Sequence, residues 1–409
     1  VEKVMHTKTP PFLELFKQLA HEGGSKSFKR YFASLGKTYR FCVLSNGDGL
    51  FATLMFDISD RETLRQKMHD LVYKDPLTGL YNRRYYRETI SFFVQDHNFP
   101  LTVALIDINA LKLANDAFGH ETGDELIRRL SGMIKNCLKD DAWVARIGGD
   151  EFVILLPRME EESAHACMKR LLAIASETQV RHIKMSFAYG IATMRKGMDY
   201  EVVYKKAENY LYADKLKSAS KIRRRMLQLI EKTLHENAPW ERTHVERVRN
   251  LSLRFARELE FSEEEEHRLS LAARFHDIGK TAIDSAILNK TSALTDKESL
   301  EMNRHPEIGY RIMMALNTYG EIAETILRHH ENVDGSGYPL GVKKDEIPLA
   351  SRILRITEAY DAMVSDRPGN PGKMPHAAQA ELERNKGTLF DGTLVDIFIR
   401  RIVPLEKTL

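Results

Sequence analysis

The spacing of apolar residues divides the chain into three parts. Residues 1–60 end in a strand pattern, residues 74–221 alternate between strand and helix periods, and residues 222–409 keep a helical period almost throughout. Alternating strand and helix periods predict an α/β domain, whereas a helical period alone predicts an all-α domain. We therefore predict a multidomain chain in which a short β-rich segment is followed by an α/β domain and then by an all-α domain.

The N-terminal segment contains one clear hairpin and is followed by a helical connector. Residues 38–58 read as two strands joined across Asn46 and Gly47, a dipeptide that favours a tight turn. The connector occupies residues 61–73, and its apolar positions suit a dimer seam or simple packing about equally well. Those positions are Leu64, Met68 and Leu71.

The α/β part contains four predicted strands with amphipathic helices between them. The strands are residues 101–108, 143–147, 152–156 and 185–193. This order predicts an α/β sandwich built around split βαβ units. Asp107 lies near the end of the first strand and Asp150 lies in the turn GGDE. If these strands are neighbours, the two carboxylates could hold Mg²⁺ against a triphosphate, although a lone GGDE is more often merely a hairpin tip.

Composition and charge narrow the class of protein. A chain of 409 residues with 43% hydrophobic residues has enough material for two or three cores. Its 61 basic and 58 acidic residues are nearly balanced, so we predict no nucleic-acid partner. The basic run KIRRRM at residues 221–226 is interpreted as a solvated linker face.

Cysteine usage and the lengths of the apolar runs bear on the location of the protein. Cys42, Cys137 and Cys167 lie far apart without a CxxC spacing, so neither a disulfide framework nor a thiolate metal site is indicated. A cytoplasmic location fits this usage. No run approaches the roughly 18 apolar residues of a membrane span, and we expect no membrane contact within this chain.

Three motifs in the α/β part follow one another in an order typical of one family. They are DPLTGLYNRR at residues 75–84, DINALKLANDAFGHETGDEL at 107–126 and GGDEF at 148–152. Through these motifs residues 74–221 resemble the GGDEF family of diguanylate cyclases. The resemblance implies a palm-like cyclase sandwich that binds GTP with Mg²⁺. It also implies that Asp107, Asp150 and the carbonyl group of Ile108 bind the metal, and that Glu151 helps to activate the attacking hydroxyl group.

The resemblance further implies nucleotide contacts, of which one is altered. Asn115 and Asp124 would read guanine, because a carboxylate accepts from a ring N–H and an amino group that adenine does not offer together. Further implied contacts are Gly148, Gly149 and Lys215. Where the family continues from this lysine to a Gly-Arg pair, the sequence reads LKSASK, so one guanidinium contact to the triphosphate is missing. Slow synthesis and GTP sensing without turnover are the two resulting interpretations.

Six of the fifteen histidines fall between residues 244 and 330. His244 shares an apolar helical stripe with Val248 and Leu251, and His276 shares one with Ala273, so both should point inward. A single inward histidine is more often a hydrogen-bonded core residue than a ligand. Five histidines with an aspartate, however, offer more donors than one tetrahedral metal can use. They are His244, His276, Asp277, His305, His329 and His330.

This group predicts two metals that share the carboxylate of Asp277. We expect the cations, rather than a buried lysine or arginine, to stabilise that carboxylate, since an isolated buried charge is costly. Two such cations can activate a water molecule for attack on phosphorus. His267, in the acidic run SEEEEHRL, is expected to be solvated.

Five motifs surround the histidines in an order typical of a second family. They are HDIGK (276–280), HPEIG (305–309), HHENVDGSGYP (329–339), AYDAM (359–363) and SDRP (365–368). Through them the all-α part resembles the HD-GYP family of cyclic-di-GMP phosphodiesterases. The resemblance implies two iron or manganese ions, and histidine with carboxylate agrees with that class of metal without selecting one.

The second resemblance also implies roles for individual residues. One metal would be held by His244, His276, Asp277 and Glu358, and the other by Asp277, His305, His329 and His330. With Asp277 as the shared catalytic carboxylate, Lys280 and Arg367 would hold the phosphate charge, and the turn residues Gly337, Tyr338 and Pro339 would contact the nucleotide.

Two positions depart from the HD-GYP pattern. Glu358 stands where the family usually has aspartate, so its geometry as a ligand differs by one methylene. Trp240 stands where some members have a glutamate for a third metal, so we predict two metals rather than three.

Together the patterns predict a protein of cyclic-di-GMP turnover. The HD-GYP half hydrolyses cyclic di-GMP, and the GGDEF half binds GTP and either makes the dinucleotide or senses GTP. Synthesis requires two GTP-loaded subunits and hence a homodimer through the connector. Cyclic GMP-AMP as the substrate of the helical half, and a binding scaffold without catalysis, are the remaining alternatives. Residues 1–60 resemble the last strands of a PAS sensor domain, without an identifiable ligand.

Overall fold

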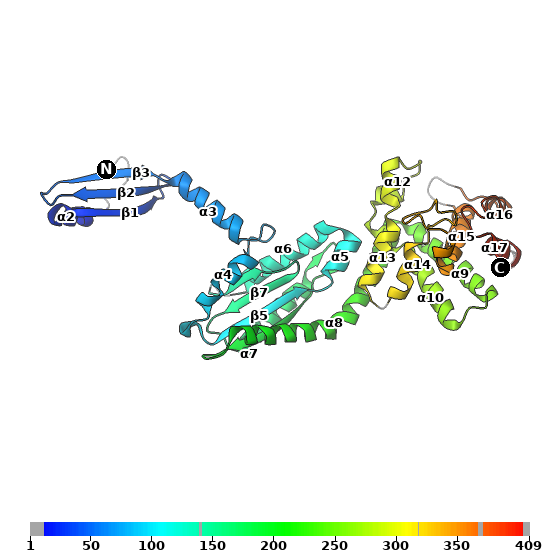
Figure 1. Ribbon diagram of the computed structural model, residues 1–409, viewed down its shortest axis with the longest axis horizontal. Coiled ribbons are helices and arrows are strands. Elements are labelled where there is room, and N and C mark those ends of the chain that lie inside the picture. Colours follow the sequence, from blue (N-terminus) through cyan, green and yellow to red (C-terminus); the bar gives the residue numbers. More distant parts are fainter. Residues whose placement is uncertain (1–11, 139–140, 318, 367–370, 404–409) are drawn as a thin grey trace. The chain divides into compact units, whose positions relative to one another are not determined.

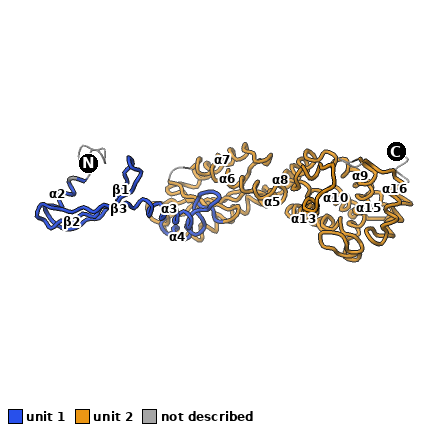
Figure 2. Tube along the Cα trace, turned by 90° about the horizontal axis from the view of Figure 1, so that it is seen from above, with its two compact units in different colours: residues 1–92, 145–147 blue, residues 93–144, 148–409 orange. Residues whose placement is uncertain are grey.

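The computed structural model describes residues 12–138, 141–317, 319–366 and 371–403. Within them the chain forms two compact units (Figure 2): residues up to 92 with 145–147, and residues 93–144 with those from 148 onward. No helix in the described ranges has the length and apolar character needed to cross a membrane. Arg367, one of the predicted phosphate contacts, lies outside the described residues.

The first unit opens with an antiparallel sheet of order β1-β2-β3 (Figure 1). Its elements are α2 (Leu13–Glu22), β1 (Gly24–Phe32), β2 (Lys37–Ser45) and β3 (Phe51–Asp57). The predicted hairpin is confirmed as β2 and β3, whereas β1 was not predicted because its side chains are mostly exposed and polar. The sheet is held by aromatic packing, since the rings of Phe28 and Phe41 stack with centroids 5.2 Å apart.

The predicted connector is a helix, α3 (Ser59–Tyr73), without a buried residue. Its apolar positions Leu64, Met68 and Leu71 are 60%, 58% and 83% exposed. The same unit contains α4 (Arg83–Phe93) and the short β4 (Tyr81–Asn82), which pairs in parallel with Ala145 and Arg146. The α3 stripe is thus available for a partner helix.

The second unit contains three antiparallel strands in the order β10-β5-β7. They are β5 (Leu101–Ile108), β7 (Glu151–Leu156) and β10 (Phe187–Met194), and together with β6 (Trp143–Arg146) they confirm the four predicted strands to within two residues at either end. Every residue of β5 is buried, because it is the middle strand of the three and the helices α7 and α8 pack against it. The register places Asp107 opposite Glu151, the residue after Asp150.

Helices pack on this sheet, and the last of them leads into the helical part. They are α5 (Leu111–Phe118), α6 (His120–Cys137), α7 (Glu161–Glu177) and α8 (Tyr200–Asn237), with a small pair β8 (Gln179–Val180) and β9 (Ile183–Lys184). α8 is continuous over 38 residues, so the boundary predicted between residues 221 and 222 falls inside one helix.

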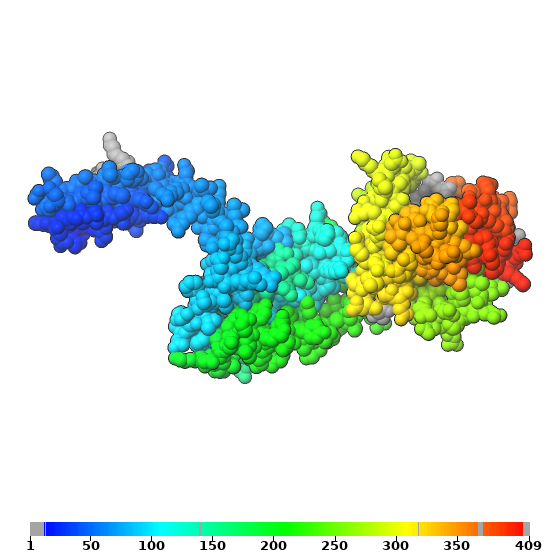
Figure 3. Space-filling view, viewed as in Figure 1, coloured from blue at the N-terminus to red at the C-terminus, as the bar shows by residue number. Residues whose placement is uncertain are grey.

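The remaining chain is helical, as predicted, and packs into one body (Figure 3). Its helices are α9 (Pro239–Glu258), α10 (Glu263–Phe275), η2 (Ile278–Ala282), α11 (Ser285–Leu288), α12 (Asp296–Met302), α13 (His305–Ala315), α14 (Gly320–Leu327), η3 (Lys344–Glu346), α15 (Leu349–Val364), α16 (Pro375–Arg384), α17 (Gly392–Ile397) and η4 (Phe398–Ile402). The stripe of His244 is buried in this core with Val248 and Leu251, which confirms its inward orientation.

The contact between β10 and α8 is close enough to require glycine. A Cβ atom on Gly190 would lie 2.0 Å from the carbonyl oxygen of Ala207 and 2.3 Å from the backbone nitrogen of Leu211. Both are backbone atoms of α8, so the helix rather than a side chain would have to move.

We expect Gly190→Ala to lower the free energy of unfolding by about 1–3 kcal/mol, because the added methyl group pushes α8 off the sheet. Thermal denaturation of the full chain measures the shift. Gly132→Ala is the matched control, since Gly132 lies within α6 with no atom within 4 Å of its Cβ position. Equal melting temperatures for the two variants would contradict this account of the packing.

Candidate metal centre and nucleotide pocket

Five helices bring the predicted ligands of the helical part to one point. Within unit 2, His276 and Asp277 follow the end of α10, His305 begins α13, and His329 and His330 follow α14. The remaining two ligands lie inside helices, His244 on α9 and Glu358 on α15. Because most of the donors lie at helix ends, no single helix could present them together.

The carboxylate of Asp277 lies at the centre of the group. Its Oδ2 atom is 3.0 Å from Nε2 of His276 and 3.5 Å from Nε2 of His244, and its Oδ1 atom is 3.3 Å from Nε2 of His305. The donor atoms form two sets, and within each set all atoms lie within 4.8 Å of one another. The sets are His244, His276, Asp277 and Glu358, and Asp277, His305, His329 and His330. They contain the same residues as the two ligand sets that the HD-GYP resemblance implies.

Backbone carbonyl groups orient three of the imidazoles. Nδ1 of His276, His305 and His329 lies 2.8, 2.8 and 2.6 Å from the carbonyl oxygen three residues earlier in the chain. A carbonyl oxygen can only accept, so each Nδ1 carries a proton, and in the neutral ring the lone pair lies on Nε2. That lone pair is what a metal ligand must offer.

A carboxylate orients the fourth imidazole. Nδ1 of His244 donates to Oδ2 of Asp361 over 2.6 Å, and Arg247 donates to the same carboxylate. Burial raises the pKa of Asp361, but the hydrogen bonds from His244 and Arg247 outweigh it and hold the pKa at about 2. The charged carboxylate fixes the ring and makes its Nε2 more basic.

The protonation states suit metal binding. Burial lowers the pKa of His305 to about 4 and that of His329 to about 3, and it also lowers the pKa of His330. These three rings are therefore neutral near pH 7. Burial acts in the same direction on His276, but the neighbouring Asp277 charge overrides it and raises the pKa to about 9. The negative field that favours a proton on His276 equally favours a cation.

Asp277 also has a buried lysine as a neighbour, which the sequence analysis excluded. Lys280 Nζ lies 2.7 Å from Asp277 Oδ2 and 2.7 Å from Oε1 of the fully buried Glu241, and it lies over the ring of Trp240. The prediction that cations alone stabilise Asp277 was therefore wrong. Lys280 offsets two buried carboxylates, and the attraction of Asp277 and Glu241 raises its pKa although burial acts in the opposite direction.

The lysine does not satisfy every buried oxygen of the group. Among the described residues, Oδ1 of Asp277 and Oε2 of Glu358 accept no hydrogen bond. Buried carboxylate oxygens without a donor are costly unless a cation binds them. Neutral imidazole nitrogens facing such oxygens are a suitable donor set for divalent metals, so the residues present fit the implied ions.

The loop after the paired histidines is held by a residue that the sequence analysis did not single out. The buried Glu331 accepts backbone N–H groups of Leu340, Gly341 and Val342 at 2.7, 3.2 and 3.1 Å. This anchors the loop of Gly337, Tyr338 and Pro339, and the Tyr338 ring stacks on His330 with centroids 4.8 Å apart. A Cβ on Gly337 would lie 2.3 Å from the backbone nitrogen of Asn332, so the turn requires glycine there.

Sequence reasoning also missed Glu241 and Asp361. Asp361 lies within the motif AYDAM, three residues after Glu358, and this spacing places both carboxylates on one face of α15. That spacing was a usable signal. The sequence carries no comparable signal for Glu241, because only the fold brings it to Lys280.

The acidic residues of the α/β part line a separate pocket of about 290 Å³. Asp107, Ile108, Asp150 and Lys215 all contribute to its wall, and Lys215 pairs with the carboxylate of Asp107. Burial raises the pKa of Asp107 to about 6; Lys215 opposes this shift and Asp150 adds to it. Two carboxylates and a lysine around one pocket suit a metal with a phosphorylated ligand.

The other predicted residues of this half lie outside that wall. The carboxylate of Glu151 lies next to Gly148, where an added Cβ would be 2.7 Å from Oε2, and Gly149 follows at the tip of the hairpin. The amide oxygen of Asn115 lies against Gly123, the residue before Asp124. The structure therefore places the two predicted guanine readers close to each other, and Asp124 is partly exposed.

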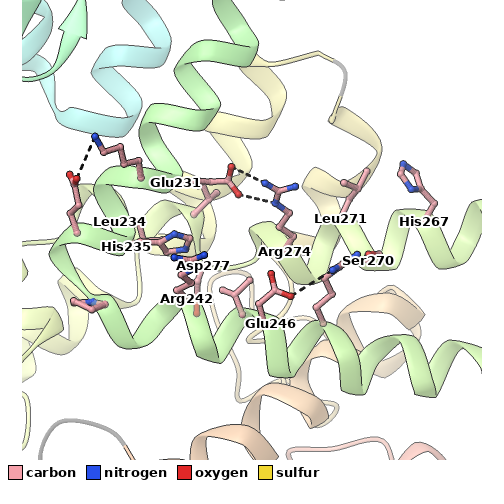
Figure 4. A pocket seen from close by; sticks show the side chains of 16 residues that line it. Glu231, Leu234, His235, Arg242, Glu246, His267, Ser270, Leu271, Arg274 and Asp277 are labelled. Carbon is pink, nitrogen blue, oxygen red and sulfur yellow. Dashed lines mark hydrogen bonds and ion pairs between the residues drawn. The ribbon is translucent and has the colours of Figure 1, made fainter.

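A cavity of about 990 Å³ also lies in the helical part (Figure 4). It is lined by α8, α9 and α10, and Asp277 and Ile278 also contribute to its wall. Several of its polar groups are engaged with one another: Arg274 Nε donates to Glu231 over 2.8 Å, and Arg249 Nε donates to Ser270 over 2.8 Å. The cavity therefore offers no convergent set of donors comparable to the histidine group.

Two known families match the chain. Residues 72–221 match the family described as diguanylate cyclase, GGDEF domain, and residues 228–394 match the HD domain.

Three curated proteins illustrate the similarity. The cyclic di-GMP phosphodiesterase response regulator RpfG of Xanthomonas campestris is 39% identical over 165 residues, 40% of this chain and 44% of that protein. A cyclic di-GMP phosphodiesterase of Thermotoga maritima is 41% identical over 168 residues, covering 40% and 44%. The 3'3'-cGAMP-specific phosphodiesterase 3 of Vibrio cholerae is 34% identical over 160 residues, covering 39% and 35%. The chain thus spans less than half the length of these relatives.

We expect Asp361→Asn to lower the affinity for divalent metal by roughly 10- to 100-fold, because the amide no longer holds His244 with a full negative charge. Metal retained per chain after dialysis against increasing chelator concentrations measures the effect. The matched control is Asp345→Asn, an exposed residue of η3. Equal retention in both variants would contradict the role of Asp361.

Proposed function

We propose that this chain, in which a GGDEF domain is joined to an HD domain, hydrolyses cyclic di-GMP at the histidine group of its HD domain. The observation that carries the proposal is the convergence of two four-residue donor sets on the shared carboxylate of Asp277. The relatives named as cyclic di-GMP phosphodiesterases support the choice of substrate.

Each donor set would hold one cation, iron or manganese. When bound, two such cations supply Lewis acidity that activates water and neutralises charge on the phosphoryl group. Asp361 and the backbone carbonyl groups keep the imidazole lone pairs directed into the centre. Buried walls around the centre limit its exposure to bulk water and so strengthen these charge interactions.

The chain's remaining groups would bind and orient the dinucleotide. Lys280, positioned by Glu241, places a positive charge beside Asp277 for a phosphate approaching the centre. The loop of Gly337, Tyr338 and Pro339 lies against His330 and would contact the nucleotide. Arg367 would add a guanidinium contact.

A second substrate is favoured by one specific observation. One similar protein is a 3'3'-cGAMP-specific phosphodiesterase, and the metal centre itself contains no group that reads a base. Cyclic GMP-AMP would meet the same metal and phosphate contacts. The choice between the two dinucleotides therefore depends on residues around the centre.

The GGDEF domain would bind GTP with Mg²⁺ at the pocket of Asp107 and Asp150. Asn115 and Asp124 would read guanine, and Glu151 would assist the attacking hydroxyl group if the domain is a cyclase. Synthesis requires two such domains facing each other, and the exposed stripe of α3 supports a homodimer through that helix. A GTP sensor without turnover is the alternative, motivated by the altered sequence after Lys215.

We expect the metal-loaded chain to convert cyclic di-GMP to linear dinucleotide or GMP. His276→Ala and Asp277→Ala should each lower the rate by more than the roughly 100-fold typical of losing a residue that only supports a ligand. Product analysis by chromatography, run in parallel with cyclic GMP-AMP, measures both rate and substrate choice.

His267→Ala is the control for this experiment, because His267 is exposed and belongs to neither donor set. A metal-loaded chain that binds cyclic di-GMP but leaves it intact would favour the scaffold alternative over the proposed hydrolysis.

We expect GTP to bind in a Mg²⁺-dependent manner and to be converted slowly to cyclic di-GMP, with Asp150→Asn abolishing the conversion because a metal ligand is lost. Chromatography of the nucleotides after incubation identifies the product. Asp96→Asn, an exposed surface residue, is the matched control. If GTP binds but remains unchanged, the interpretation of the domain as a GTP sensor replaces that of a cyclase.

A further inference from the structure

We infer that Arg223, on α8, supplies the guanidinium contact to the triphosphate that the sequence after Lys215 lacks. The inference rests on the proposed nucleotide site and names one more residue of it. It also gives a role to the basic run KIRRRM, which the sequence analysis interpreted as a solvated linker face.

The position of Arg223 follows from the periodicity of α8. Lys215, Ala219, Ile222 and Arg223 all line the pocket that contains Asp107 and Asp150. Ala219, Ile222 and Arg223 follow Lys215 by four, seven and eight positions in α8. This spacing places all four residues on one face of the helix. Arg223 thus stands on the same wall as Lys215, about 12 Å further along the helix axis.

Its side chain is available for a ligand. Arg223 is half-buried, and its guanidinium makes no hydrogen bond or ion pair with any described residue. Lys215, by contrast, is engaged with Asp107. Arg223 is therefore an uncommitted guanidinium on a pocket that also presents the carboxylates of Asp107 and Asp150.

The chemistry of the group matches a polyphosphate. Guanidinium remains charged at all relevant pH values and offers paired N–H donors that fit phosphate oxygens in a fork. A metal held by Asp107 and Asp150 would neutralise part of the triphosphate, and Arg223 would neutralise a further part. Lys112 also lines the pocket, but its ammonium is a point charge without this fork.

The neighbouring arginines provide an internal comparison. Arg224 is exposed and lines none of the described pockets, whereas Arg225 lines a different cavity beside His182 and Met185. Of the three consecutive arginines, Arg223 is therefore the one on the nucleotide pocket.

The test is the binding of GTP and GMP to the full chain with Mg²⁺, measured by calorimetry. We expect Arg223→Ala to weaken GTP binding by about 10- to 100-fold, the range of a lost charge-assisted contact, while GMP binding changes little. Arg223→Lys should give an intermediate loss. Arg224→Ala is the matched control and should bind GTP as the unaltered chain does.

The outcomes separate this inference from the proposal on which it rests. If the unaltered chain binds GTP and Arg223→Ala binds it equally well, the inference fails while the nucleotide site stands. If the unaltered chain binds no GTP, both fail. Thermal melting checks the fold of each variant, and Arg223→Lys supplies the comparison should the alanine variant unfold.

Discussion

The burial of one negative charge, the carboxylate of Asp277, is the constraint on which the helical half depends. Around it the chain places imidazoles from α9, α10, α13 and α14, together with Glu358 from α15. Only 1% of Asp277 is exposed, so its charge must be balanced by groups of the protein and by bound cations. The ends of several helices are directed to one point as a consequence.

The charge balance extends beyond the metal ligands. Lys280 lies between Asp277 and Glu241, and Asp361 lies between His244 and Arg247, so positive and negative groups alternate outward from the centre. Such alternation lets a buried group remain charged and fixed in orientation. The nucleotide pocket shows a similar pairing of opposite charges, since Lys215 forms an ion pair with Asp107.

Much of the fold could be predicted because hydrophobic periodicity is a local property. The strand at residues 101–108, the hairpin and the connector helix all follow from spacing within the elements themselves. β1 could not be recognised, because a strand with exposed polar side chains on both faces carries little periodic signal. The buried lysine was misjudged for a related reason: spacing places Lys280 near Asp277, but burial is decided by the elements packed over both.

The sequence by itself determined the division into an α/β and a helical part, four strands of the α/β part and the inward direction of His244 and His276. Only the tertiary structure decided which groups meet across elements: Glu241 with Lys280, Asp361 with His244, and Arg223 with the pocket of Asp107. The physical reason is that helical periodicity fixes the direction of a side chain relative to its own axis. The partner it meets depends on which other helix or strand packs against that face.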